Sequence, residues 1–233
     1  MSLRDDLIAE VKEIFQSQWE TRKGQIVPGP EDLQLGNHAV TLDATVLYAD
    51  LADSTVMVDE QPEYISAEIY KTYMACAARI IKRSGGTITA YDGDRIMAVF
   101  IGGTKNSIAA KTGLQITWAV DKILNPAIRR QYGKDAYQVS HVVGIDSSPL
   151  RACRIGVRND NDLVWVGSAA NHAAKLSSIS TNGSAVYLSE SVYKKLHTSS
   201  KIGGDPPRNM WTETQEWMYG EAKIYRSGWQ WAI

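Results

Sequence analysis

Apolar and polar positions follow two different spacings along this chain, and each spacing predicts one kind of element. Near the start, apolar residues recur three or four positions apart, which indicates an amphipathic helix of about four turns. These positions are Leu3, Leu7, Ile8, Val11, Ile14 and Phe15. A polar stretch rich in glycine and proline follows and is typical of a linker. An apolar run that ends at Asp50 then predicts a buried strand.

Beyond Asp50 the pattern changes several times between helix and strand. Helices are expected at residues 61–84, 105–130, 168–179 and 189–196. Strands are expected in the aromatic tail and at residues 87–91, 95–100, 138–146, 150–157, 163–166 and 184–189. The first two of these numbered strands are joined by Asp-Gly-Asp, a strong hairpin signal. The order β-α-β-β-α-β predicts an α+β fold of the ferredoxin-like, split βαβ kind, with an N-terminal helix and a C-terminal strand extension.

Three regions are expected along the chain. Residues 1–38 form the N-terminal helix and linker, residues 39–200 the main domain, and residues 201–233 a tryptophan-rich extension packed on that domain. Three of the seven tryptophans fall in the last 17 residues, which favours packing in the core or in a dimer over a ligand box. They are Trp217, Trp229 and Trp231.

The bulk composition narrows the class of protein. Of the 233 residues, 44% are hydrophobic and 22% are charged, and the formal net charge is −1, so the basic excess of a nucleic-acid binder is absent. Two cysteines cannot form a disulfide framework, and the first residues lack an apolar signal core. No run approaches the roughly 18 apolar residues that span a bilayer. A soluble protein of the reducing cytoplasm is expected, without nucleic acid or direct membrane insertion.

Two carboxylates stand at strand ends that a split βαβ sheet brings side by side. Asp50 ends the first strand of the main domain, and Asp94 lies in the hairpin, so the two can converge. Carboxylates together with substrate phosphates commonly hold Mg²⁺, and two such ions activate an attacking oxygen and stabilise a leaving phosphate. Aspartate in Asp-Gly-Asp is also a common turn residue. A charge at the end of an apolar strand, as at Asp50, is costly unless something pairs with it.

A helix is expected to begin directly after Asp50. Asp53, Ser54 and Thr55 are interpreted as its N-cap, because such side chains satisfy the free donors of a helix start. The remaining backbone N–H groups suit a polyphosphate, so Ser54 and Thr55 are also candidate substrate-binding residues. Asp53 is assigned to the cap and not to metal.

Three segments in this order resemble the motifs of the class III nucleotidyl cyclases, the family of adenylate and guanylate cyclase catalytic domains. LYADLADST resembles the first metal motif, GGTITAYDGDRIMAVF the second, and VWVGSAANHAAKL the motif with an asparagine and a basic residue. The resemblance covers roughly residues 42–200. It implies a head-to-tail homodimer with composite sites, in which the ribose 3′ oxygen of a nucleoside triphosphate attacks the α-phosphorus and releases pyrophosphate.

The resemblance also implies roles for individual residues. Asp50 and Asp94, together with the carbonyl of Leu51, would bind two Mg²⁺ or Mn²⁺ ions per site. Asn171 would orient the ribose, and Lys175 stands where the family usually has an arginine that stabilises the transition-state phosphate. Their i, i+4 spacing puts Asn171 and Lys175 on one helix face. One subunit would supply the aspartates and the other the asparagine and the basic residue.

At two basic positions the match to the family pattern is incomplete. Lysine at position 175 replaces a bidentate guanidinium by a point charge, which is not a conservative change. Arg158, before the Asn-Asp-Asn turn, lies near the position that binds the triphosphate in the family, and Arg154 is the alternative. An ordinary surface arginine is an equal alternative for both.

The residues that read a purine in the family are absent. Counting from the motifs places Ala90 and Val164 where adenylate cyclases carry lysine and aspartate, and where guanylate cyclases carry glutamate and a small polar residue. A site without those groups lacks the hydrogen bonds that select either purine. Tyr48 lies two residues before Asp50 on the same strand face, where its hydroxyl would narrow the pocket and offer a hydrogen bond. A buried strand aromatic is the other interpretation of Tyr48.

These features are most similar to the bacterial pyrimidine cyclases of Pycsar anti-phage systems. The resemblance implies a uridylate cyclase that makes cyclic UMP as a second messenger for a co-encoded effector. No residue decides between UTP and CTP, so a cytidylate cyclase is an alternative, as is an adenylate cyclase with a divergent pocket. A catalytically inactive nucleotide-binding module is the alternative from another class. His141 and His172 lack metal-ligand spacing and are interpreted as structural.

Overall fold

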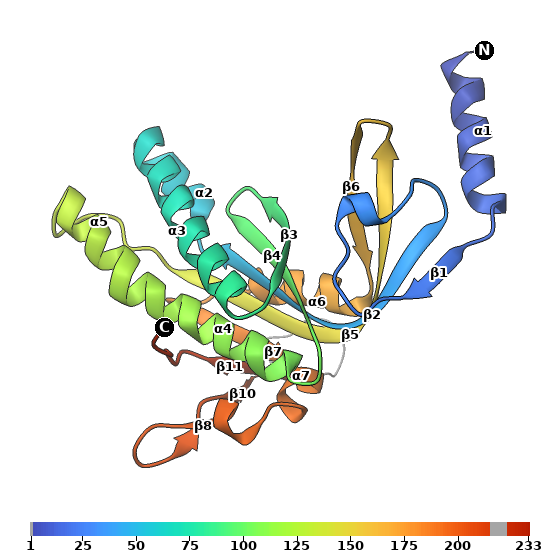
Figure 1. The fold of residues 1–233 in the computed structure, drawn as a ribbon. Coiled ribbons are helices and arrows are strands. Elements are labelled where there is room, and N and C mark those ends of the chain that lie inside the picture. The colour runs from blue at the N-terminus through green and yellow to red at the C-terminus, as the bar shows by residue number, and fades with distance from the viewer. Residues whose placement is uncertain (1, 215–222) are drawn as a thin grey trace.

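The computed structural model describes residues 2–214 and 223–233, and nine of the described strands form one mixed sheet (Figure 1). The strands follow the order β10-β11-β7-β5-β2-β4-β3, with β1 beside β2 and β6 beside β5. Near the centre lies β2, antiparallel to both β4 and β5. The main strands are β2 (His38–Leu51), β3 (Thr87–Asp92), β4 (Arg95–Ile101), β5 (His141–Val157), β6 (Asp160–Val166) and β7 (Ala185–Ser189).

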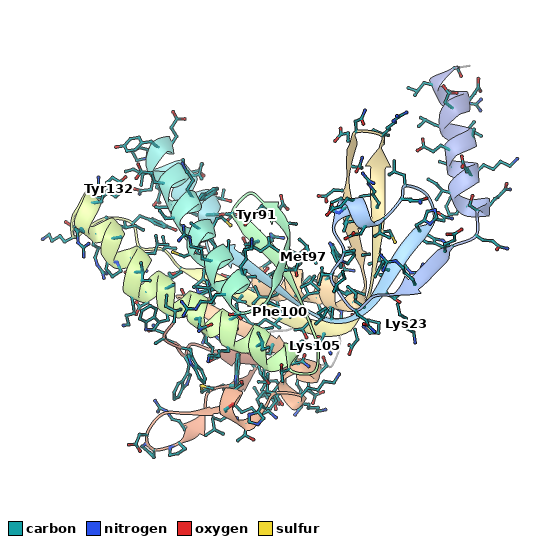
Figure 2. All side chains as sticks on the ribbon, viewed as in Figure 1. Lys23, Tyr91, Met97, Phe100, Lys105 and Tyr132 are labelled. Carbon is teal, nitrogen blue, oxygen red and sulfur yellow. The ribbon has the colours of Figure 1, made fainter. Side chains whose placement is uncertain are left out.

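Helices cover both faces of the sheet, with α2 to α5 over one face and α6 on the other (Figure 1). The helices are α2 (Ser54–Glu60), α3 (Glu63–Arg83), α4 (Lys105–Ala119), α5 (Asn125–Tyr132), α6 (Ser168–Ser177) and α7 (Glu190–Lys194). Because strand side chains alternate between faces, β2 serves both layers. Leu47 and Ala49 pack in a large cluster under α3 and α4, whereas Tyr48 packs in a smaller cluster under α6. On β4, Phe100 packs in the large cluster and Met97 in the smaller one; both residues are labelled in Figure 2.

The prediction of a break between two strands in the middle of the chain is wrong. Strands were expected at 138–146 and 150–157, but β5 runs without interruption from His141 to Val157. Pro149, which favours a break because it has no N–H, is paired with β2, while pairing with β7 ends at Ile145 and pairing with β6 begins at Arg151. β5 has a partner on only one side at Pro149, so the missing N–H need not cost a ladder hydrogen bond.

The long helix expected at 105–130 is present but irregular. A π-helical stretch, Val120–Leu124, joins α4 to α5. Pro126 lies at the start of α5, where its missing N–H removes a helical hydrogen bond, and a π-helical turn accommodates such a disruption.

The N-terminal region has one more element than expected. α1 (Leu3–Gln16) forms as expected and stands away from the sheet (Figure 1). Residues predicted as linker include β1 (Glu20–Lys23), which pairs in parallel with β2. Asn37 donates hydrogen bonds to the carbonyls of Ile14 (2.8 Å) and Ser17 (2.7 Å), and thereby ties the end of α1 to the start of β2. No helix in the described part of the chain has both the length and the apolar character that crossing a bilayer requires.

The C-terminal region extends the sheet beyond β7. β10 (Thr212–Thr214) and β11 (Ile224–Ser227) are the expected tail strands, and β8 (Ile202–Gly203) pairs with β9 (Arg208–Asn209) in a separate two-stranded sheet. Trp211 is buried in the large cluster, and Trp229 and Trp231 pack against it. These tryptophans therefore hold the tail on the main domain. Trp217 lies outside the described residues.

Candidate active site

Asp50 lies next to the end of β2 and is only 8% exposed. Its Oδ2 accepts a hydrogen bond from Arg95 Nε at 3.1 Å, and Arg95 is its cross-strand neighbour at the start of β4. This ion pair explains how the end of an apolar strand carries a charge. Arg95 was missed from the sequence, because its position opposite Asp50 depends on the register of the hairpin.

The charges around Asp50 come from the same hairpin. Burial raises the pKa of Asp50 to about 6; the Arg95 guanidinium lowers this pKa, and the charges of Asp94 and Asp92 raise it. Asp94 and Asp92 thus lie close enough to Asp50 to repel its charge. A cation bound among these carboxylates would relieve that repulsion.

The carbonyl of Leu51 points toward the same hairpin. In the pairing of β2 with β4, Asp50 lies opposite Arg95. Asp94 directly precedes Arg95, so it occupies the next position, opposite Leu51. The N–H of Ala52 donates to a carbonyl on the β5 side at 3.0 Å. Since neighbouring residues of an antiparallel strand direct their backbone groups to opposite sides, the carbonyl of Leu51 is directed to the side of Asp94. The Asp50 carboxylate, the Leu51 carbonyl and Asp94 therefore lie at one end of the sheet.

This donor set fits hard divalent ions. In the part of the chain that the structure describes, no three His, Cys, Asp or Glu side chains gather as a metal site. Two carboxylates and one carbonyl are oxygen donors of the kind that Mg²⁺ and Mn²⁺ prefer, with water and substrate phosphates completing the coordination. The residues are thus suited to ions that bind together with a nucleotide.

Tyr48 is half-buried on the face of β2 that also carries Asp50. It packs in the smaller cluster together with Ala90, which follows a bulge in the pairing of β3 with β4. Burial raises the pKa of Tyr48, and the nearby charge of Arg95 lowers it. Its hydroxyl has no hydrogen-bond partner among the described residues. Tyr48 therefore brings an available phenol close to the carboxylates, which packing alone does not require.

Val164 is not brought into this group. Its neighbours Leu163 and Trp165 on β6 pack in the smaller cluster, so the alternation of the strand turns Val164 to the other face. Ala90 and Val164 occupy the two positions at which related cyclases bind a purine base, and within one chain only Ala90 lies beside Tyr48.

Asn171 and Lys175 lie one turn apart on α6 and are both exposed. The buried residues of α6 are on its opposite side, against the sheet: Ala169, Ala170, Ala173, Leu176 and Ser177. Gly144 of β5 allows this helix to pack closely, because a Cβ at Gly144 would lie 2.1 Å from the carbonyl oxygen of Ala173. The polar pair is thus held on a rigid support and directed away from its own sheet.

A buried acid beside α6 was also missed from the sequence. Asp146 of β5 is 4% exposed, and its carboxylate bonds with Ser189, with Ser191 (3.2 Å) and with Nδ1 of His172 (3.0 Å). His172 directly follows Asn171, so this contact fixes the helix turn that carries Asn171. A single aspartate in the apolar stretch HVVGID was the signal that a buried network is present.

His141 is fully buried, in agreement with its interpretation as structural. Its Nδ1 lies 3.3 Å from the Tyr73 hydroxyl and its Nε2 lies 3.1 Å from Thr117 Oγ1. Burial lowers the pKa of His141 to about 3.

The expected side-chain cap after Asp50 is only partly correct. Asp53 occupies the N-cap position of α2, but its side chain accepts no hydrogen bond from the helix. Its backbone is left-handed, with φ 54° and ψ 31°, a conformation that turns the chain sharply and that aspartate tolerates better than most residues. Ser54 and Thr55 follow as the first two residues of α2.

The two arginines considered for the triphosphate differ in their contacts. Arg154 is engaged within the chain: its Nε donates to Asn161 Oδ1 at 2.7 Å and a terminal nitrogen donates to the carbonyl of Leu33 at 3.0 Å. Arg158 is exposed near the tip of the β5–β6 hairpin. These contacts favour Arg158 as the side chain that is available for a ligand.

The chain is similar to curated proteins over its whole length. It is 46% identical over 234 residues to a uridylate cyclase of Xanthomonas perforans and 47% identical over 235 residues to a uridylate cyclase of Burkholderia cepacia, in each case covering 100% of both chains. No protein-family model matches the chain.

The fold is that of solved cyclase domains. The adenylyl cyclase CyaB from P. aeruginosa superposes with a TM-score of 0.67 at 20% identity, over 81% of this chain and 95% of that one. The expected α+β, class III cyclase fold is therefore confirmed. With its whole length matched at 46–47% identity, the chain belongs to the uridylate cyclase family of class III nucleotidyl cyclases.

Proposed function

We propose that the chain converts UTP to 3′,5′-cyclic UMP and pyrophosphate, with two Mg²⁺ or Mn²⁺ ions in each site. The observation that carries this proposal is the full-length identity of 46–47% to two uridylate cyclases. The convergence of Asp50 and Asp94, and the hydroxyl of Tyr48 beside them, support it.

Each candidate residue has a task in this reaction. Asp50, Asp94 and the carbonyl of Leu51 would hold the ions, which would neutralise the phosphates and make the ribose 3′ oxygen a better nucleophile. Asn171 orients the ribose, and Lys175 places a positive charge where the transition state gains negative charge. Arg95 pairs with Asp50 and keeps its carboxylate charged and in place before substrate arrives.

The remaining residues would bind the triphosphate and the base. Ser54, Thr55 and Arg158 would contact phosphate oxygens. Tyr48 would select the smaller pyrimidine through its bulk and offer its hydroxyl to the base, and Ala90 and Val164 leave out the polar groups that a purine needs.

A second copy of the chain is proposed to complete the site. In one chain Asn171 and Lys175 face away from the sheet that carries Asp50. A head-to-tail dimer would place this pair opposite the carboxylates of the partner. The product would then act as a second messenger in anti-phage defence through a co-encoded effector, in the cytoplasm.

The test is incubation of the purified protein and Mn²⁺ with each of the four ribonucleoside triphosphates, followed by identification of cyclic products by mass spectrometry. Cyclic UMP as the main product supports the proposal; cyclic CMP or cyclic AMP as the main product would replace UTP by the alternative substrate. Asp50→Asn should abolish product formation. Asp53→Asn, three residues away and compatible with a left-handed backbone, is the matched control and should retain activity.

A further inference from the structure

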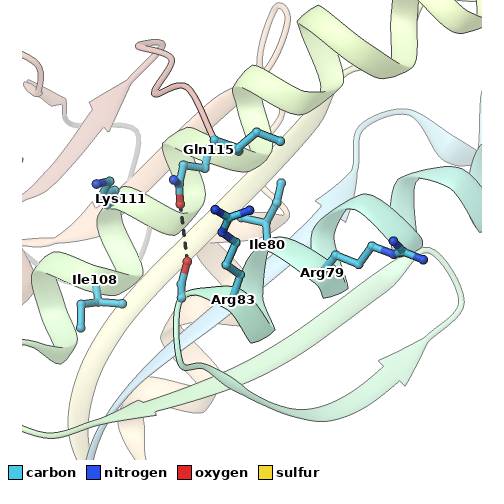
Figure 3. A pocket seen from close by; sticks show the side chains of 8 residues that line it. Arg79, Ile80, Arg83, Ile108, Lys111 and Gln115 are labelled. Atoms are coloured by element: carbon cyan, nitrogen blue, oxygen red, sulfur yellow. Dashed lines mark hydrogen bonds between the residues drawn. The ribbon is translucent and has the colours of Figure 1, made fainter.

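A second pocket lies between α3, α4 and the last residues of the chain (Figure 3). Its volume is about 500 Å³, within the range of small-molecule sites. β3 begins just after this pocket, at Thr87, and leads to Asp92 beside the carboxylates of the active site. Six strand residues at about 3.3 Å each separate the two places by about 20 Å. The pocket is therefore not part of the metal site of the same chain.

Three cations line this pocket, and no acidic side chain does. Arg79 and Arg83 lie one turn apart on α3, and Lys111 comes from α4. The Arg79 side chain points away from those of Arg83 and Lys111, which lie on either side of the Ser84–Gln115 contact (Figure 3). Within the described residues, none of the three lies within ion-pair distance of an acidic side chain or of the terminal carboxylate. The chain as a whole has 25 basic and 26 acidic residues, so three cations without an ion pair are a local excess of positive side-chain charge, which the terminal carboxylate of Ile233 partly offsets.

The position of these cations is not explained by helix electrostatics alone. Arg83 lies in the last turn of α3, where a positive charge complements the helix dipole. Arg79 lies one turn earlier, and Lys111 lies in the middle of α4. The dipole effect fades within the last turn, so it accounts for only one of the three.

The walls of the pocket are held together by contacts among three segments. Ser84 Oγ at the end of α3 donates to Gln115 Oε1 on α4 at 3.5 Å (Figure 3). The N–H of Trp231 donates to the carbonyl of Leu114 at 3.2 Å, and Lys111 Nζ lies 4.7 Å from the centre of the Trp231 ring. A pocket whose walls are fixed before a ligand binds loses less entropy on binding.

We propose that this pocket binds a small phosphate-bearing molecule. Arg83 and Lys111 hold its phosphate, because a guanidinium binds phosphate oxygens through paired charge-assisted hydrogen bonds and an ammonium adds a point charge. The uncharged part of the ligand rests on the apolar side chains that line the pocket, which are Ile80, Ile108 and Ile233. Inorganic phosphate and a phosphate ester share the chemistry that the cations recognise, and the apolar lining favours the ester.

The test is a titration of the full chain, labelled at isoleucine methyl groups, followed by nuclear magnetic resonance. The probes are UMP, inorganic phosphate and uridine, each added in the presence of EDTA so that no divalent ion recruits nucleotide to Asp50. The methyl signals of Ile80, Ile108 and Ile233 report the pocket, and the buried methyl of Ile145 reports an intact fold. Arg83→Gln combined with Lys111→Gln is the test variant. Lys82→Gln removes an exposed charge from the same helix without touching the pocket and is the matched control.

We expect UMP to shift the three pocket methyls in a saturable way, uridine to leave them unchanged, and the double variant to weaken UMP binding by about tenfold or more. Lys82→Gln should stay within about twofold of the wild type. Inorganic phosphate binding more weakly than UMP identifies an ester as the ligand, and equal binding identifies free phosphate. The proposal is overturned if millimolar UMP shifts no pocket methyl, if uridine shifts them equally, or if Lys82→Gln weakens binding as much as the double variant. Should the double variant lose the Ile145 signal, Lys111→Gln takes its place with the same expected loss.

Discussion

Replacing Gly144 with alanine should disable the enzyme by moving α6. The added Cβ would lie 2.1 Å from the carbonyl oxygen of Ala173 and 2.5 Å from the backbone nitrogen of Ser177. Ordinary contacts begin near 3.4 Å, so α6 has to retreat by more than about 1 Å. Both contacts are to backbone atoms, so no side-chain rotation relieves them.

The retreat of α6 has two measurable consequences. Overpacking of this kind costs about 1–3 kcal/mol of stability. Asn171 and Lys175 move with the helix, and a misplacement of about 1 Å in a reacting group can lower the rate about 100-fold. We therefore expect Gly144→Ala to lower kcat for cyclic UMP formation by about two orders of magnitude, well beyond what its loss of stability would cause at a temperature where the variant stays folded.

The assay is steady-state cyclisation of UTP together with urea unfolding of the same samples. Gly103→Ala is the matched control, because a Cβ at Gly103 meets nothing within 4 Å; its kcat and stability should stay near those of the wild type. A kcat of Gly144→Ala within about threefold of the wild type would refute the reasoning, because it would mean either that α6 tolerates the shift or that its polar pair does not act in catalysis.

Three further predictions follow from individual side chains. Lys175→Ala should lower kcat about 100-fold with little change in KM, and Lys175→Arg should lower it less; equal rates for Lys175→Ala and the wild type would contradict a role at the phosphate. Tyr48→Phe should reduce the preference for UTP over ATP, measured as the ratio of kcat/KM values, by about five- to tenfold, the effect of one lost hydrogen bond; an unchanged ratio would leave Tyr48 as a packing residue. Burial lowers the pKa of His141 from 6.5 to about 3. Between these two pH values the imidazole is protonated in the unfolded chain but not in the folded one, so the folded state loses stability as the pH falls below about 6.5. His141→Gln should remove a slope of up to about 1.4 kcal/mol per pH unit in urea unfolding between pH 6.5 and 4.5, and an unaltered slope would show that another group titrates there.

The features predicted well from the sequence are those set by neighbours along the chain. The hairpin at Asp94 follows from Asp-Gly-Asp, and the common face of Tyr48 and Asp50 follows from the two-residue period of a strand. The common face of Asn171 and Lys175 follows equally from the helical period. In each case a local rule of geometry decides the outcome, and no distant contact competes with it.

The features that were missed depend on residues far apart in the chain. Arg95 faces Asp50 only because β4 pairs with β2 in one particular register. Asp146 is satisfied by groups from α6 and from the β7–α7 junction, which no local pattern connects. The unbroken β5 depends on which neighbouring strand pairs with Pro149. Register and sheet order are outcomes of packing, and a single sequence states them only indirectly.

The geometry of one chain also gives the physical reason for proposing a composite site. Asp50 is nearly buried on the sheet face that α6 covers, whereas Asn171 and Lys175 lie on the side of α6 opposite its buried residues. Turning that pair inward would bury Lys175 and expose the alanines that pack against β5, at the cost of burying a charge and of losing apolar contacts. A second chain avoids that cost, because it can present an exposed pair to the carboxylates without any change in its own packing. The same arrangement that stabilises each chain therefore keeps the two halves of the chemistry apart until two chains meet.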